Sequence, residues 1–333
     1  MQNNSLKPDA SIAGWRALES LPLALFGGVM GLTGLSVAWR LAHVRFEVPM
    51  FISISVGGFA VIAFVMVAVG YAVKVSIAPD KVQAELRHPT AGTMFGTLLV
   101  SLLLLPLVLA PVCLALAQTM WAIGALGMLV FALSIVSRWI NNRQEIVHAT
   151  PAWIVPVVGL LDVPLAVPLL NLPPMHGVMV LGLSVGLFFA VPLFTIIFSR
   201  LVFGPPMADA LQPSLMILVA PFSVGFSAYV STVGKVDLFA EALYVTTLFL
   251  LVVLVGRLRY LPICCPFRVS WWAVSFPLAA SAIAALRFAQ AEPGWLTDAI
   301  ALMLLAFATV TIVWLLIRTL AGIALGELRT LSS

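Results

Sequence analysis

The sequence predicts an all-α polytopic membrane protein with ten transmembrane helices. Hydrophobic residues make up 62% of the 333 residues and charged residues only 9%, whereas a soluble domain carries about 25% charged residues. The mean hydropathy is +1.14. A membrane helix needs about 20 mainly apolar residues, and ten runs of that kind follow one another along the chain.

The ten predicted spans are joined by connections of alternating character. The spans cover residues 21–40, 51–73, 92–113, 118–138, 151–170, 176–199, 212–230, 238–256, 269–289 and 296–317. Connections after the second, fourth, sixth and eighth spans are longer and charged, such as KVSIAPDKVQAELRH, and those after the third, fifth and seventh are short. No connection is long enough for a soluble domain.

The basic residues test this count and orient the chain. Of the 17 Lys and Arg residues, 13 fall on the side that holds both termini. Those are Lys7, Arg16, Lys74, Lys81, Arg87, Arg138, Arg143, Arg200, Arg257, Arg259, Arg268, Arg318 and Arg329, against Arg40, Arg45, Lys235 and Arg287 on the other side. The positive-inside rule then places both termini in the cytoplasm, with the chain in the inner (plasma) membrane. This placement accounts for the net charge of +4 without a nucleic-acid partner.

These boundaries divide the chain into three parts. We expect a cytoplasmic N-terminal segment over residues 1–20, a ten-helix transmembrane pore domain over 21–317 and a cytoplasmic tail over 318–333.

Prolines divide the spans into two kinds. The odd-numbered spans contain Pro22, Pro106, Pro111, Pro156, Pro164, Pro168, Pro213, Pro221 and Pro277, and the even-numbered spans contain only Pro192. The odd-numbered spans begin about every 60–70 residues, which indicates an internal repeat. The predicted unit is a helical hairpin of one proline-kinked helix and one straight helix, used five times.

The kinked helices belong inside the molecule. A kink leaves a carbonyl without its usual partner, which lipid cannot satisfy. Small residues agree with this placement, because FGGVMGLTG in the first span offers Gly27, Gly28, Gly31 and Gly34, and such spacing allows helices to approach closely. We expect five inner and five outer helices.

Ionisable groups are nearly absent from the spans. Asp162 is the only acidic residue at the centre of a span, where no Lys or Arg occurs, whereas proton-coupled carriers and pumps usually keep several. The four histidines, His43, His88, His148 and His176, fall near span ends or in loops. Because catalysis and metal binding need clustered His, Asp, Glu or Cys, neither an enzyme nor a metal site or other cofactor is predicted.

A pore lined by uncharged side chains is compatible with the passage of anions. Helix ends and free backbone N–H groups supply partial positive charge without trapping the ion, and basic loops at the mouth concentrate anions. In WWAVSFPLAASA, Phe276 precedes Pro277 among small residues, so its ring could block such a bore. Phe26 and Phe222 have comparable neighbours. From the residues alone, packing or lipid contact is the more common role of such rings in a membrane helix.

Five stretches carry a resemblance to a known family: LPLALFGGVMGLTGLSVAW, AELRHP, HATPAWIVP, LVAPFSVGFSAYVSTVGKVD and WWAVSFPLAASA. Together they resemble the tellurite-resistance/dicarboxylate transporter family, which includes bacterial tellurite-resistance proteins and plant guard-cell slow anion channels. The resemblance implies five hairpins in a quasi-five-fold arrangement around a central pore, assembled as a homotrimer.

The resemblance also implies roles for individual residues. It makes Phe276 the pore gate, places Phe26 and Gly27 beside the pore, and makes Pro221 and Phe222 candidates for its lining. With the kink prolines Pro106, Pro156 and Pro277 these complete the candidate site.

Asp162 departs from the expected neutral lining. An ionised carboxylate facing the bore would repel anions, so Asp162 either faces a neighbouring helix or a wet vestibule, or acts as a protonation site. The sequence therefore predicts an anion channel for small monovalent anions such as chloride or nitrate, in contact with membrane lipids. The alternatives are a C4-dicarboxylate transporter (malate or succinate), proton-linked through Asp162, and a tellurite-resistance efflux protein.

Overall fold

The computed structural model describes residue 19 and residues 21–258 and 267–325. Over these ranges all regular secondary structure is helical. Among the described residues, ten helical spans are long and apolar enough to cross a membrane, which confirms the predicted number and a multi-pass membrane protein. They cover Leu23–Phe46, Met50–Ile77, Ala91–Leu109, Leu114–Asn141, Pro151–Leu169, His176–Phe203, Asp209–Val233, Leu238–Gly256, Val269–Ala291 and Trp295–Ala324.

Several helices extend beyond the predicted apolar runs. The first continues to Phe46 and the last to Ala324, past the predicted ends at residues 40 and 317. Arg45 and Arg318 lie in these extensions. Both are tolerated there because long basic side chains reach the membrane interface from the last turns of a membrane helix. Apart from residue 19, the predicted N-terminal segment lies outside the described residues, as do residues 326–333 of the predicted tail.

Each odd-numbered span begins as a 3-10 helix and continues as an α-helix. The pairs are η1 (Leu23–Leu25) with α2 (Phe26–Phe46), η2 (Ala91–Met94) with α5 (Phe95–Leu104), η4 (Pro151–Ile154) with α8 (Val155–Val158), η7 (Asp209–Val219) with α11 (Ala220–Val233), and η8 (Val269–Val274) with α14 (Ser275–Ala291). The third span restarts at α6 (Pro106–Leu109), and the fifth continues through η5 (Gly159–Asp162), α9 (Val163–Ala166) and η6 (Val167–Leu169).

Prolines mark where these new segments start. Pro106, Pro156 and Pro221 each occupy the first turn of a helical segment, where a missing N–H group costs no intrahelical bond. Pro277 is the third residue of α14, so it too lies in a first turn. The change of helix type falls just before Ser275, and Pro277 therefore starts the α-helical part of the ninth span instead of interrupting it.

The even-numbered spans are single helices on the outside. They are α3 (Met50–Ile77), α7 (Leu114–Asn141), α10 (His176–Phe203), α12 (Leu238–Leu258) and α15 (Trp295–Ala324), and α10 continues through Pro192. The odd-numbered spans are 61–89% buried and the even-numbered spans 17–33%. This alternation agrees with five inner and five outer helices, and their quasi-five-fold arrangement stays a prediction.

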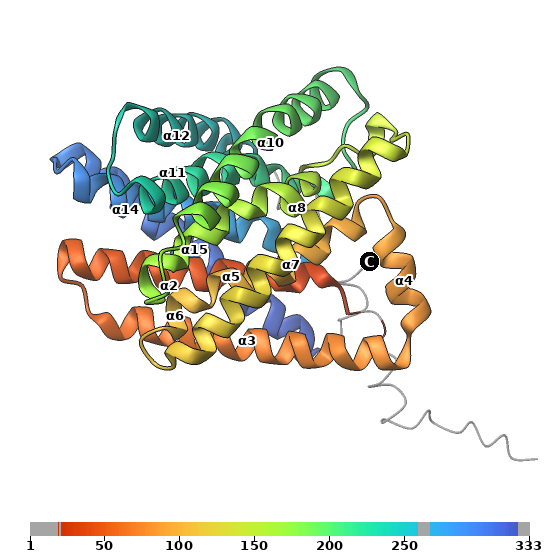
Figure 1. Cartoon of the computed structure of the whole chain (residues 1–333), viewed down its shortest axis with the longest axis horizontal. Helices are drawn as coiled ribbons and strands as arrows, with labels where there is room; N and C mark the ends of the chain where they lie inside the picture. Colours follow the sequence, from red (N-terminus) through yellow and green to blue (C-terminus); the bar gives the residue numbers. More distant parts are fainter. Residues whose placement is uncertain (1–18, 20, 259–266, 326–333) are drawn as a thin grey trace, which may run out of the picture.

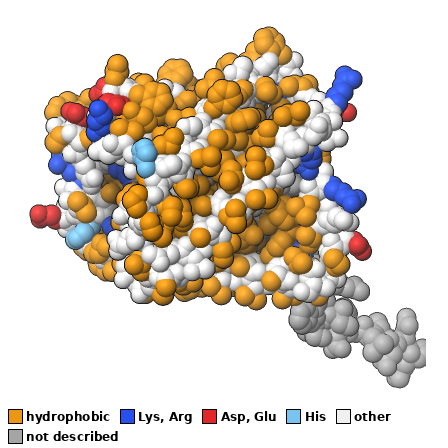
Figure 2. Space-filling model, viewed as in Figure 1, with side chains coloured by type: hydrophobic (Ala, Val, Ile, Leu, Met, Phe, Trp, Pro, Cys, Tyr) orange, Lys and Arg blue, Asp and Glu red, His pale blue; other side chains and the backbone are white. Residues whose placement is uncertain are grey.

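The two ends of the molecule differ. The charged helix α4 (Pro79–Arg87) and the turn η3 (Ile146–His148) lie where the odd-numbered spans begin, at the right of Figure 1; we call this the α4 end. The short connection between α2 and α3 lies at the opposite, far end. Figure 2 shows a broad hydrophobic surface between these ends, with most charged side chains at either end. The positive-inside rule predicts that the α4 end faces the cytoplasm.

Candidate functional site

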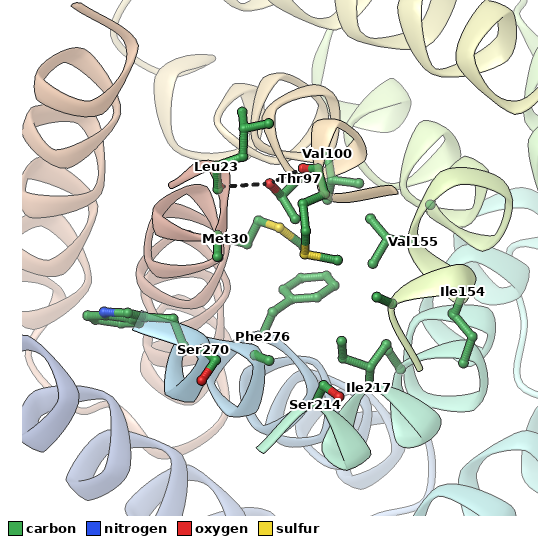
Figure 3. Close-up of a pocket in the computed structure, with 18 of the residues that line it drawn as sticks. Leu23, Met30, Thr97, Val100, Ile154, Val155, Ser214, Ile217, Ser270 and Phe276 are labelled. Carbon is green, nitrogen blue, oxygen red and sulfur yellow. Dashed lines mark hydrogen bonds between the residues drawn. The ribbon is translucent and has the colours of Figure 1, made fainter. Parts of the chain in front are cut away.

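A cavity of about 510 Å³ extends into the molecule from the α4 end. The 3-10 segments of all five odd-numbered spans line it, through residues such as Leu23, Met94, Ile154, Ile217 and Trp272. Figure 3 shows several of these side chains converging from separate helices. The five repeats therefore contribute the same kind of element to one shared space.

Phe276 projects into this cavity. In Figure 3 its ring lies near Met30 and Ile217, and its side chain is only 8% exposed. Ser275 fixes the start of α14, because its hydroxyl donates to the carbonyls of Trp272 at 2.7 Å and Gly27 at 3.0 Å. The ring is thus placed at the junction of η8 and α14, against α2.

Three polar groups in the cavity wall lack partners. The hydroxyls of Thr150 and Ser270 and one carboxyl oxygen of Asp162 are buried without a hydrogen bond, and all three residues line the cavity. In addition, four of the five 3-10 segments at the cavity have no side-chain cap on their first N–H groups; in η2 the N–H of Ala91 donates to Nδ1 of His88 at 3.1 Å. Hydroxyl and N–H donors at helix starts favour an anion.

Asp162 is the exception in this wall. It ends η5, is 2% exposed and has no ion-pair partner among the described residues. A carboxylate here would repel an anion in the cavity. Asp162 therefore lines the cavity with one carboxyl oxygen unpaired among the described residues.

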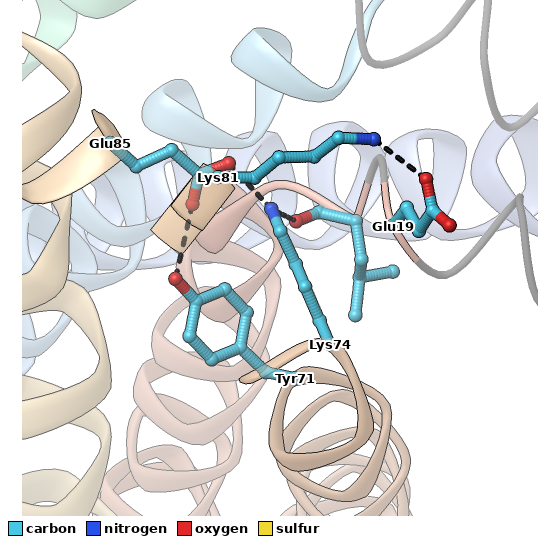
Figure 4. Close-up of polar contacts among 6 residues, drawn as sticks. Glu19, Tyr71, Lys74, Lys81 and Glu85 are labelled. Atoms are coloured by element: carbon cyan, nitrogen blue, oxygen red, sulfur yellow. Dashed lines mark hydrogen bonds and ion pairs between the residues drawn. The ribbon is translucent and has the colours of Figure 1, made fainter. Parts of the chain in front are cut away.

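The other acidic group of the cavity, Glu85 on α4, is compensated. Lys74, only 1% exposed, donates to Glu85 at 2.5 Å and to the carbonyl of Leu21 at 2.8 Å. The hydroxyl of Tyr71 donates to the second carboxyl oxygen of Glu85 at 3.1 Å, as Figure 4 shows. These contacts tie α4 to α3 and to the start of the first span, and so fix the rim of the cavity.

The predicted site residues separate into two groups. Phe276, Pro277, Gly27 and Asp162 line the cavity. Pro106, Pro156 and Pro221 are buried at helix starts outside its wall.

Phe26 and Phe222 lie outside the cavity wall as well. The Phe26 ring packs against Phe64 of α3 with centroids 6.0 Å apart, and Phe222 packs against Phe194 of α10 at 5.7 Å. Both rings therefore join inner helices to outer ones.

Sequence reasoning missed most of the polar lining. Thr97, Ser214 and Ser270 line the cavity, and the available signal was a Ser or Thr in the first turns of three odd-numbered spans. No lysine or arginine among the described residues lines it. Within the same ranges no three His, Cys, Asp or Glu side chains come together in a way that could hold a metal ion.

Known proteins match this chain over most of its length. The family model described as SLAC1, voltage-dependent anion channel, matches residues 20–320. The chain is 26% identical to the S-type anion channel SLAH3 of Arabidopsis thaliana, covering 92% of this chain and 49% of the relative. It is 24% identical to the guard cell S-type anion channel SLAC1 of the same plant, covering 92% and 56%.

A bacterial relative matches over almost its whole length. The tellurite resistance protein TehA homolog of Haemophilus influenzae is 26% identical, covering 92% of both chains. The chain thus spans about half the length of the two plant relatives.

Proposed function

Because the chain belongs to the SLAC1 family of voltage-dependent anion channels, we propose that it conducts small monovalent anions, such as chloride or nitrate, between its five inner spans. An ion enters the cavity from the α4 end, meets the hydroxyls of Thr150 and Ser270 and the uncapped helix starts, and is stopped at Phe276. No covalent chemistry is involved.

The position of Phe276 carries this proposal. Its ring projects into a cavity that all five repeats line, and it packs there with apolar neighbours including Met30 and Ile217. A dry ring across a conduit excludes hydrated ions, as hydrophobic constrictions do in other channels. Pro277 and Ser275 fix the backbone beside it, so the gate opens by rotation of the ring or by a shift of α14.

The test is the current through Phe276→Ala. We expect the anion current in a planar bilayer to rise about tenfold or more over wild type, since a barrier only about 1.4 kcal/mol lower suffices for that change. Phe222→Ala is the matched control, because it removes a ring from another inner span that packs on α10 outside the cavity. Equal currents in the wild type and Phe276→Ala, or an equal rise in the control, would contradict the gate.

The unpartnered Asp162 favours a second candidate, proton-linked transport of C4-dicarboxylates such as malate or succinate. A protonatable group at membrane depth is typical of carriers. Uptake of labelled succinate by proteoliposomes, driven by an imposed pH gradient, tests it. A passive current that reverses at the chloride equilibrium potential, without such uptake, supports the channel instead.

Three further expectations accompany the proposal. Efflux of a toxic oxyanion such as tellurite is a third function, prompted by the name of the Haemophilus relative, and growth on tellurite tests it. We expect a homotrimer in the inner (plasma) membrane, with lipids against the apolar outer helices. Both termini are expected in the cytoplasm, on the α4 side.

A further inference from the structure

Two arginines at the far end lack the acidic partner that their neighbour has. Arg45 forms an ion pair with Asp298 at 3.0 Å. Arg40 and Arg287, by contrast, have no ion pair with any described carboxylate. Both are partly buried, in the first and ninth spans.

Arg287 lies in line with the proposed gate. It follows Phe276 by 11 residues on α14, which is within about 20° of three full turns and about 16 Å farther toward the far end. Its guanidinium donates to the carbonyl of Ser227 at 3.1 Å and to the hydroxyl of Ser231 at 3.0 Å. Arg287 therefore joins the inner helices α14 and α11.

Arg40 approaches the same place from the other side. Its guanidinium donates to the carbonyl of Leu107 on α6 at 2.6 Å. The carbonyl of the next residue, Leu41, accepts a hydrogen bond at 3.3 Å from Gln290, which follows Arg287 by three residues on α14. Four inner spans, the first, third, seventh and ninth, thus meet around these two cations.

This arrangement is costly unless an anion is present. Partly buried charges are normally compensated by an opposite charge, and each guanidinium has five N–H donors, of which the bonds above use few. Beside them, the hydroxyl of Ser227 is buried, only 4% exposed, and has no hydrogen-bond partner. Ser227 is the residue whose carbonyl holds Arg287, so this unused donor lies next to the cation pair.

We infer that Arg40, Arg287 and the Ser227 hydroxyl form a binding site for a small monovalent anion at the far end of the conduction path. The inference rests on the proposed function, because it treats this end as the continuation of the path beyond Phe276. No described lysine or arginine lines the cavity on the α4 side, so the fixed positive charge along the path lies here. The site holds an ion that has come from the α4 end and has passed the Phe276 ring. It equally holds an ion that has come from the far end and has not yet reached that ring.

The experiment measures binding without transport. Purified full-length protein in gluconate is titrated with chloride, and separately with nitrate, while its thermal unfolding temperature is recorded. We expect a saturable rise for the wild type, since a ligand bound only by the folded state stabilises it. Arg287→Gln should weaken the apparent affinity at least about tenfold, equivalent to about 1.4 kcal/mol. Arg287→Lys, which keeps the charge, should retain part of it.

Controls separate this site from general charge effects. Arg45→Gln removes a positive charge from the same end but breaks only the pair with Asp298, so its anion response should equal that of the wild type. If Arg287→Gln does not fold, Arg40→Gln and Ser227→Ala replace it, and both should weaken binding. The site is wrong if the wild type shows no saturable response, or if the variants that fold respond as the wild type does.

The outcome is independent of the gate experiment. A wild type that binds chloride through these residues while Phe276→Ala carries no current would retain the site and refute conduction. Large currents through Phe276→Ala with unchanged binding in the arginine variants would retain conduction and refute the site.

Discussion

Asp162 is the residue at which the channel and carrier proposals give opposite results. In a channel, Asp162→Asn removes a carboxylate from the cavity wall, and we expect the chloride current at neutral pH to rise. At an effective dielectric constant of about 20, two unit charges repel by about 1 kcal/mol or more at any separation up to about 16 Å, which corresponds to a fivefold or larger increase. Bilayer recordings of the variant in the Phe276→Ala background, where current is measurable, provide the test.

The carrier proposal expects a different result for the same substitution. Without a protonatable group, uptake of succinate driven by a pH gradient should be lost while chloride current stays at its background value. An unchanged current together with lost uptake would therefore remove the channel proposal and keep the carrier.

Gly31 shows how closely the first and ninth spans pack. A Cβ atom at this position would collide with the Cβ and hydroxyl of Ser275, the residue that fixes the start of α14. We expect Gly31→Val to lower the free energy of unfolding by about 1–3 kcal/mol, as overpacking does in other cores, and thermal unfolding of the purified protein measures it. Gly58→Val on α3 is the control, because no atom lies within 4 Å of a Cβ there. Equal losses in both variants would contradict the packing argument.

At the scale of helices, the hairpin repeat was predictable because the prolines are concentrated in the odd-numbered spans. The 3-10 segments were not, since Leu23–Leu25 and Val269–Val274 are apolar runs that a hydropathy pattern cannot distinguish from α-helix. Nor does a hydropathy pattern show which of two neighbouring residues on an inner helix faces the cavity. Neighbouring positions on a helix point about 100° apart, so once Gly27 faces the cavity, Phe26 faces α3. The residues around Phe276 alone left packing as its commoner role, and its position beside a pore was implied by the family resemblance; in the structure it lines the cavity.

The connection between the seventh and eighth spans carries a pH-sensitive cap. The hydroxyl of Tyr229 donates to Asp237 at 2.8 Å, and the backbone N–H groups of Phe239 and Ala240 donate to its other oxygen. The Tyr229 hydrogen bond, followed by these N–H groups, holds the pKa of Asp237 below its ordinary value of 3.8. The ionised carboxylate thus caps the start of α12.

A lowered pKa in the folded state fixes the sign of the pH effect. The contribution of Asp237 to stability is complete above the ordinary aspartate pKa and is lost as pH falls through the lower, folded-state value. We expect Asp237→Asn to lower the unfolding temperature at neutral pH and to flatten the fall in stability below pH 3.8. Unfolding temperatures of both proteins across this range test it, and parallel curves would contradict the role of the cap.

At the scale of the molecule, burial distinguishes inner from outer spans and the distribution of charge predicts which end faces the cytoplasm. The odd-numbered spans are the more buried and begin at the α4 end, and the positive-inside rule predicts that this end faces the cytoplasm. The apolar surfaces of the outer helices fit lipid and neighbouring protomers alike, so the chain alone contains no signal that distinguishes a trimer from a monomer. Orientation, in contrast, can be tested with one native residue.

Cys113 provides that test. It is free and exposed in the short connection between α6 and α7, at the far end, whereas Cys264 and Cys265 lie outside the described residues. With both of these changed to serine, we expect a membrane-impermeant maleimide to label Cys113 in intact cells. Gln83→Cys on the exposed face of α4, in a chain that also carries Cys113→Ser, should react only after the membrane is permeabilised. The reversed pattern would place the α4 end outside, and anions would then enter the cavity from the cell exterior and meet the Arg40–Arg287 site last.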